Sequence, residues 1–141
     1  RDGSNREETT LSLSEYFENT KGLGVLATAD DGGRPNTAIY ARPHVMEEGT
    51  VAFIMANRLS RANIEANPYA SYLFVEEGGG YKGKRLVLER VRMESDPEVI
   101  GKLRRRAYSP GDEEKVGSLV LATFKVIEER PLLGAGPSPA S

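Results

Sequence analysis

Short runs rich in apolar and β-branched residues alternate with polar turns along most of the chain. The turns, such as DDGGRP and EEG, are rich in glycine, proline and acidic residues, a pattern typical of successive β-strands. Most connections are too short for parallel crossovers, so we expect mainly antiparallel strands. Several runs are apolar on both faces, which favours a closed or nearly closed barrel. Six strands are expected, at residues 23–30, 36–46, 50–56, 69–76, 85–94 and 118–129.

Three other stretches carry helix signals. Ser12 and Glu15 form a capping-box pattern, and Asp96 is placed to cap a helix whose first residue is a proline. Pro68 ends the middle helix because proline disfavours the helical conformation in the residue before it. The two helices that lie between strands should pack outside the barrel. The expected fold class is therefore mainly β, a barrel with flanking helices at residues 14–20, 58–67 and 97–108.

A length of 141 residues is typical of one domain. We expect a folded domain over 11–134, with disordered ends at 1–10 and 135–141, which are polar or rich in glycine and proline. The net charge of −2 argues against a broad nucleic-acid surface. The absence of cysteine excludes disulfides, thiolate zinc sites and cysteine nucleophiles. No run approaches the roughly 20 apolar residues of a membrane span, so we expect a cytoplasmic protein without a membrane partner.

Few residues suggest catalysis by protein side chains alone. His44 is the single histidine, beside a bend expected at Pro43, so a histidine-based metal site is not indicated, although an axial haem ligand remains an alternative. The glycine-rich EGGGYKGK is interpreted as a hairpin loop in which Tyr81, Lys82 and Lys84 could form a rim over a bound ligand. Three arginines at 104–106 suit the negative end of a helix.

The stretch NRLSRANIEANP carries the clearest binding signal. A strand that ends where a helix begins presents free backbone N–H groups at the positive end of the helix dipole. Ser60 adds a hydroxyl, and Arg58 and Arg61 are three residues apart, so their side chains can converge on one face. Such a place favours a phosphate monoester. The alternative interpretation is a surface helix with two solvated arginines.

Taken together, LGVLATAD, NTAIYAR, AFIMANRLSRANIEANP and KRLVLERV resemble the pyridoxamine 5′-phosphate oxidase-like, FMN-binding split-barrel flavoproteins, from about Leu11 to Leu133. The resemblance implies a six-stranded antiparallel split barrel and a homodimer with FMN at the interface between subunits. The better-known oxidases carry Ser-Arg-Lys where this chain has Arg58, Leu59 and Ser60. Arg58 and Arg61 could restore the missing positive charge, and the departure argues against oxidation of pyridoxamine phosphate itself.

The implied cofactor contacts fall in three groups. The phosphate is expected near Arg58, Ser60 and Arg61, and Tyr81 and Lys82 are expected to contribute from the second subunit. The flavin is expected along two strands, at residues Ala38, Ile39, Tyr40, Ala41, Arg42, Phe53, Ile54 and Met55. Arg42 could face either the phosphate or the flavin ring, whereas Asn63 is expected to tie the helix to a neighbouring loop.

Three functions follow from this resemblance. The first is a dimeric FMN-dependent oxidoreductase that passes electrons between a reduced nicotinamide, or another donor, and a small acceptor. The second is a protein on the same barrel that carries FMN or haem without turnover. The third is a structural dimer with an empty groove. Catalytic residues are not identifiable, because flavin chemistry belongs to the cofactor and the protein supplies binding and orientation.

Overall fold

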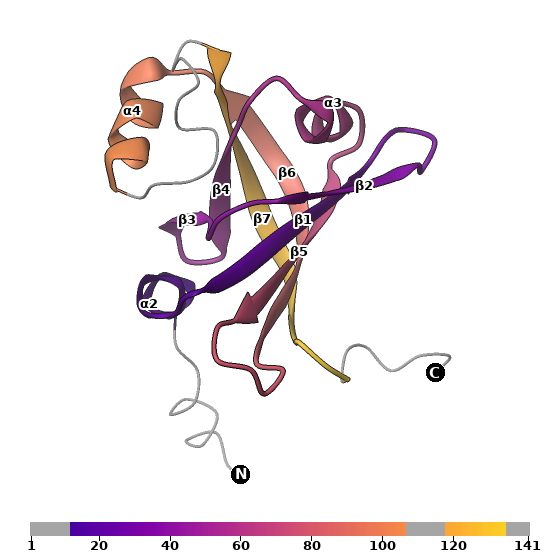
Figure 1. Ribbon diagram of the computed structural model, residues 1–141. Helices are drawn as coiled ribbons and strands as arrows, with labels where there is room; N and C mark the ends of the chain where they lie inside the picture. The colour runs from indigo at the N-terminus through magenta and orange to yellow at the C-terminus, as the bar shows by residue number, and fades with distance from the viewer. Residues whose placement is uncertain (1–11, 107–117, 135–141) are drawn as a thin grey trace.

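A computed structural model describes residues 12–106 and 118–134 of the chain. Seven antiparallel strands form one sheet in the order β2-β1-β5-β6-β7-β4-β3 (Figure 1). The strands are β1 (Gly22–Ala29), β2 (Pro35–Ile39), β3 (His44–Glu47), β4 (Thr50–Met55), β5 (Tyr69–Glu76), β6 (Gly83–Glu94) and β7 (Val120–Pro131). The helices are α2 (Leu13–Asn19), α3 (Leu59–Ala66) and α4 (Pro97–Arg106). The fold is mainly β with flanking helices, as the sequence predicted.

The strand count is seven rather than six, because the run expected at 36–46 is divided into β2 and β3. Between them, residues 40–43 leave the sheet, and we call this segment the link. The buried Tyr72 on β5 lies with its hydroxyl 3.1 Å from the carbonyl oxygens of both Tyr40 and Ala41, so its single O–H can donate to either or be shared between them. A side chain therefore replaces a strand partner at this point. Since β2 and β3 are the two edges of the sheet, the link joins those edges and nearly closes the barrel.

Aromatic side chains fill the barrel. Phe53 of β4 lies 5.0 Å from Tyr72 and 6.0 Å from Phe124 between ring centroids, in tilted and edge-to-face geometries that favour aromatic pairs. Phe17 of α2 packs edge-on against Phe74 at 5.3 Å, so α2 covers one end of the barrel. The capping box expected at the start of α2 is present, with Ser12 and Glu15 bonded reciprocally.

Helix α3 lies at the opposite end and is held by buried polar contacts. Asn63 Nδ2 donates to Thr28 Oγ1 of β1 at 3.0 Å, and both side chains are buried. Arg90 Nε of β6 donates to the carbonyl oxygen of Ile64 at 3.0 Å. Asn63 therefore ties the helix down, as expected, but its partner is strand β1 and not the neighbouring loop that the sequence suggested.

Helix α4 packs outside the barrel through a second apolar cluster. Ile100 and Leu103 are buried there against Ala52, Leu119 and Leu121. The expected cap is present, since Asp96 Oδ1 accepts a hydrogen bond from the backbone N–H of Glu98 at 3.0 Å. The predicted end of this helix near residue 108 and the two predicted disordered ends lie outside the described residues. Within the described ranges, no helix is long and apolar enough to cross a membrane.

Candidate functional site

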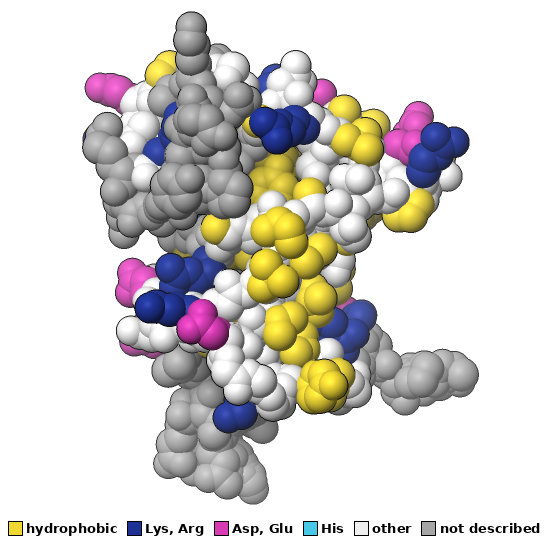
Figure 2. Space-filling model, in the orientation of Figure 1, with side chains coloured by type: hydrophobic (Ala, Val, Ile, Leu, Met, Phe, Trp, Pro, Cys, Tyr) yellow, Lys and Arg dark blue, Asp and Glu magenta, His cyan; other side chains and the backbone are white. Residues whose placement is uncertain are grey.

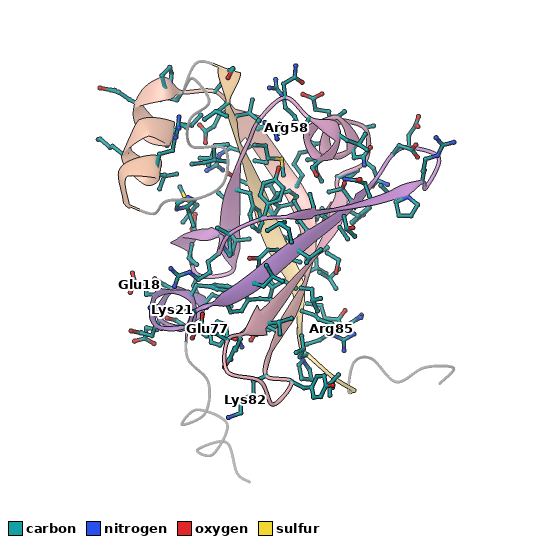
Figure 3. The ribbon with its side chains drawn as sticks, viewed as in Figure 1. Glu18, Lys21, Arg58, Glu77, Lys82 and Arg85 are labelled. Atoms are coloured by element: carbon teal, nitrogen blue, oxygen red, sulfur yellow. The ribbon has the colours of Figure 1, made fainter. Side chains whose placement is uncertain are left out.

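The N-terminus of α3 has an anion-binding geometry. Arg58 is the N-cap in extended conformation (φ −134°, ψ −175°), and no side chain caps the helix. The first N–H groups of α3 therefore point out of the helix toward a position that Arg58, an exposed residue, borders (Figure 3). Leu59, the first helical residue, leaves 58% of its surface exposed, at the position where the better-known oxidases carry arginine. The helix end thus offers backbone donors and one adjacent cation.

Ser60 connects this helix end to the link. Its side chain is 4% exposed and hydrogen-bonds the hydroxyl of Tyr40. Burial raises the pKa of Tyr40, while the bond with Ser60 and the charge of Arg58 offset part of that rise. Tyr40 also packs edge-on against Phe53 with 5.7 Å between ring centroids. The tyrosine is therefore neutral near pH 7 and holds the link against both α3 and β4.

The open edge of the barrel lies beside Tyr40, Ser60 and Phe53. β4 pairs with β3 only as far as Ala52, so the backbone of Phe53–Met55 continues beyond its last β3 partner. On the other side of the gap, β2 is the terminal strand of the sheet. Phe53 and Met55 point into the core and are at most 2% exposed, whereas Ile39 is 55% exposed. A planar ligand here would meet backbone groups of β4 and apolar side chains of β2.

Arg61 is directed elsewhere. Its Nε lies 3.4 Å from Glu65 Oε2, one turn further along α3, and its Nη1 donates weakly to the carbonyl oxygen of Ser118 at 3.5 Å. These contacts draw the guanidinium toward the start of β7. Of the two arginines considered from the sequence, Arg58 therefore stands closer to the Tyr40–Ser60 pair.

Arg42 is bonded to α2. Its Nη1 donates to the carbonyl oxygens of Phe17 at 2.6 Å and Thr20 at 3.0 Å, at the C-terminal end of that helix. Cationic side chains stabilise this helix end because the last carbonyls lack partners within the helix. Arg42 thus lies at the α2 end of the link, whereas Tyr40 lies at the α3 end.

Lys82 lies at the other end of the barrel from Arg58 (Figure 3). It is exposed in the turn between β5 and β6, beside Tyr81, which has a positive φ of 54° and is 75% exposed. Both line an open cavity of about 460 Å³ together with Tyr16 and Lys84. Within one subunit, the structure brings the predicted residues of β2 and β4 near Arg58 and Ser60, whereas Arg42, Arg61 and Lys82 are directed elsewhere.

Two features of the site escaped sequence reasoning. The Tyr40–Ser60 bond joins residues twenty positions apart, and the approach of Tyr72 to the link joins β5 to a segment far earlier in the chain. The only sequence signal for either was that Ser60 lies in the first turn of a helix that follows a core strand. Among the described residues, no group of three or more His, Cys, Asp or Glu side chains could hold a metal ion.

The family is shown by comparison with known proteins. Residues 14–133 match the family model for pyridoxamine 5′-phosphate oxidase, which is most of the chain. The chain therefore belongs to the pyridoxamine 5′-phosphate oxidase family, as the resemblance indicated. A search of curated proteins finds no match.

Solved structures share the fold at low sequence identity. HupZ from Group A Streptococcus superposes with a TM-score of 0.68 at 20% identity, covering 89% of this chain and 96% of HupZ. An FMN-binding protein from Syntrophomonas wolfei superposes with a TM-score of 0.72 at 13% identity, covering 95% and 92% of the two chains. An F420 reductase gives a TM-score of 0.62 at 18% identity, covering 85% and 98%. These likenesses establish the split-barrel fold of the chain.

Proposed function

We propose that this protein binds FMN and acts as an oxidoreductase, passing electrons between a reduced nicotinamide, or another donor, and a small acceptor. The observation that carries the proposal is the N-terminus of α3, which no side chain caps and which Arg58 borders, on a helix that follows β4 and contacts β2. Helix N-termini favour phosphate, and an apolar slot beside backbone donors suits a flavin ring. Membership of the family and the fold shared with an FMN-binding protein support the same cofactor.

The residues present fit the cofactor in distinct roles. Arg58 and the first N–H groups of α3 would hold the phosphate, and Ser60 would position Tyr40. Ile39 and the backbone of Phe53–Met55 would border the ring and exclude water from one side. FMN supplies the electron transfer itself when bound, so the protein needs only to orient the cofactor and admit the second reactant.

We also propose that the active form is a homodimer. On the outer face of β1 and its neighbours, Val25 pairs with both Ile39 and Leu73, and Leu23 pairs with Val75, so these apolar side chains share one face. Leu23 is 54% exposed, and Figure 2 shows a continuous apolar band over this part of the sheet. Contiguous exposed apolar surface marks an interaction site, and a second copy would cover it. The partner would then bring Lys82 and the β5–β6 turn toward the flavin.

The first test is a visible absorption spectrum of the purified protein with added FMN. Bound flavin bands, followed by bleaching with a reduced nicotinamide without oxygen, would support an oxidoreductase. Flavin bands without bleaching by any donor tried would indicate a carrier. A Soret band on addition of haem, with no FMN binding, would favour the haem alternative through His44, and failure of both ligands would contradict the proposal.

A sharper test concerns the phosphate. Arg58→Ala should weaken FMN binding about 10- to 100-fold, because a charge-assisted hydrogen bond contributes about 1.5–3 kcal/mol. Binding of riboflavin, which lacks the phosphate, should be nearly unchanged. Both affinities can be measured from the quenching of flavin fluorescence.

Arg61→Ala is the matched control for this test. Its guanidinium already contacts Glu65 and Ser118, so its loss should affect FMN binding much less than the loss of Arg58. Equal losses for FMN and riboflavin in Arg58→Ala would show that Arg58 does not contact the phosphate.

A further inference from the structure

A second cavity lies at the α2 end of the link, away from α3. Its volume is about 430 Å³, within the range of about 300–1,000 Å³ that is typical of small-molecule sites. It is formed where α2, the link, β3 and the end of α4 meet, as far as the described residues show. The lining residues are Ser14, Phe17, Glu18, Ala41, Arg42, Pro43, His44, Val45, Met46 and Leu103.

The charged groups of this cavity are of opposite sign. Arg42 is held in place by the bonds from its Nη1 to the carbonyl oxygens of Phe17 and Thr20. A guanidinium has five N–H donors, so a nitrogen fixed in this way leaves others able to meet a ligand carboxylate. Glu18 lies on α2, exposed and labelled in Figure 3, and contributes a negative charge to the same lining. Apart from His44, Arg42 and Glu18 are the only ionisable side chains among the described residues of the lining.

The remaining wall is apolar and pre-formed. Phe17 is 4% exposed and Leu103 is 8% exposed, so both are fixed by packing, and Pro43 is also buried. Val45 and Met46 continue this surface along β3. A ligand in this cavity would therefore place an apolar group against this apolar wall and polar groups toward Arg42 and Glu18.

We propose that this cavity binds a free amino acid, or a similar zwitterion, with an apolar side chain. A ligand carboxylate would meet Arg42, its ammonium group would meet Glu18, and its side chain would pack between Phe17 and Leu103. A purely anionic ligand would be repelled by Glu18 and a purely cationic one by Arg42. The proposal does not rest on FMN binding, although the link forms part of both sites.

The single histidine provides the measurement. His44 lines the cavity, so its imidazole carbon-bound proton signal in NMR spectra reports on this place alone. We would titrate L-phenylalanine, 3-phenylpropionate and 2-phenylethylamine into the full chain as purified. L-Phenylalanine should shift the His44 signal saturably, with an affinity at least about tenfold above either probe that lacks one charge.

Two glutamate variants distinguish binding in this cavity from a general effect of surface charge on affinity. Glu18→Gln should weaken L-phenylalanine about tenfold and leave 3-phenylpropionate unchanged or bound more tightly. Glu65→Gln, at an exposed position of α3 at the opposite end of the barrel from α2, should change neither affinity. Arg42→Gln should weaken both L-phenylalanine and 3-phenylpropionate. Because Arg42 also bonds α2, a thermal melting curve of the Arg42→Gln protein must accompany that result. If this variant is unfolded, the comparison of the two glutamate variants remains decisive.

Three results would overturn the proposal. One is the absence of a saturable His44 shift with L-phenylalanine. Another is equal binding of all three probes, which would mean that the charges play no part. The last is a Soret band with haem that disappears in His44→Ala while L-phenylalanine leaves the His44 signal unchanged, which would assign the cavity to haem. None of these results bears on FMN at α3, so the two proposals fail separately.

Discussion

At the scale of single residues, Gly24 controls the position of the link. A Cβ atom placed on Gly24 would lie 1.9 Å from the hydroxyl oxygen of Tyr72 and 2.4 Å from the carbonyl oxygen of Tyr40. The carbonyl oxygen of Gly24 also accepts a hydrogen bond from the backbone N–H of Tyr40 at 3.0 Å. Only a residue without a side chain lets β1, the link and Tyr72 meet this closely.

We therefore expect Gly24→Ala to lower the free energy of unfolding by roughly 1–3 kcal/mol, because overpacking forces the neighbouring groups to shift. The added methyl would push Tyr72 away from the link, so FMN affinity should fall as well. Urea unfolding and FMN titration measure the two effects. Gly32→Ala is the control, since its nearest neighbour would be Asp30 Oδ1 at 3.5 Å, an ordinary contact. A Gly24→Ala protein as stable as Gly32→Ala would contradict this account of the link.

At the scale of elements, the orientation of α3 depends on a buried polar pair. Asn63 and Thr28 are each at most 4% exposed, and their side chains bond at 3.0 Å. A buried polar group without a partner costs more than the net contribution of its hydrogen bond. The helix that carries the candidate phosphate site is thus fixed to β1 by a contact that tolerates little change on one side alone.

The prediction is strong coupling between these two positions. Asn63→Leu and Thr28→Val should each destabilise the protein, because each leaves one buried polar group unpaired. The double variant should be more stable than the sum of the single losses indicates, with a coupling energy of about 0.5–3 kcal/mol. Chemical denaturation of all four proteins gives this value. Simple additivity would mean that the pair does not hold α3.

At the scale of the whole molecule, the sheet presents one apolar outer face. The face runs across β2, β1 and β5, and Arg85 of β6 pairs with Leu73 at its border. Arg85 itself is bonded to the carbonyl oxygens of Pro131 and Gly134, at 2.9 and 3.1 Å, which keeps its charge toward the end of β7. The guanidinium of Arg85 therefore points away from the centre of the apolar face.

Leu23→Asp should convert the proposed dimer into a monomer, because a carboxylate at the centre of an apolar interface would be buried without a partner. Sedimentation velocity at several concentrations would show the change in mass. Val91→Asp, on a 50% exposed residue of β6 outside this face, should leave the mass unchanged. A wild-type protein that is monomeric at every concentration would exclude the homodimer.

The sequence predicted the local features well and the long-range ones poorly. The capping box of α2, the proline after α3 and the glycine turn before β6 act on their immediate neighbours, so these elements were placed correctly. The division of β2 from β3 depends on Tyr72, which lies over thirty residues later, as its bonds to Tyr40 and Ala41 show. The contacts of Arg42 with α2 also join residues more than twenty positions apart, and no local sequence pattern predicts them.

The link also acts as a tether. Because the two edge strands are consecutive in the chain, the five Cα–Cα steps from Ile39 to His44 can span no more than about 18 Å even when fully extended. The gap between β2 and β4 could therefore widen to admit a ligand, while the link keeps the ends of β2 and β3 within this distance. Loop-closure entropy is small for so short a segment. Reclosing the gap would thus cost the chain little conformational freedom.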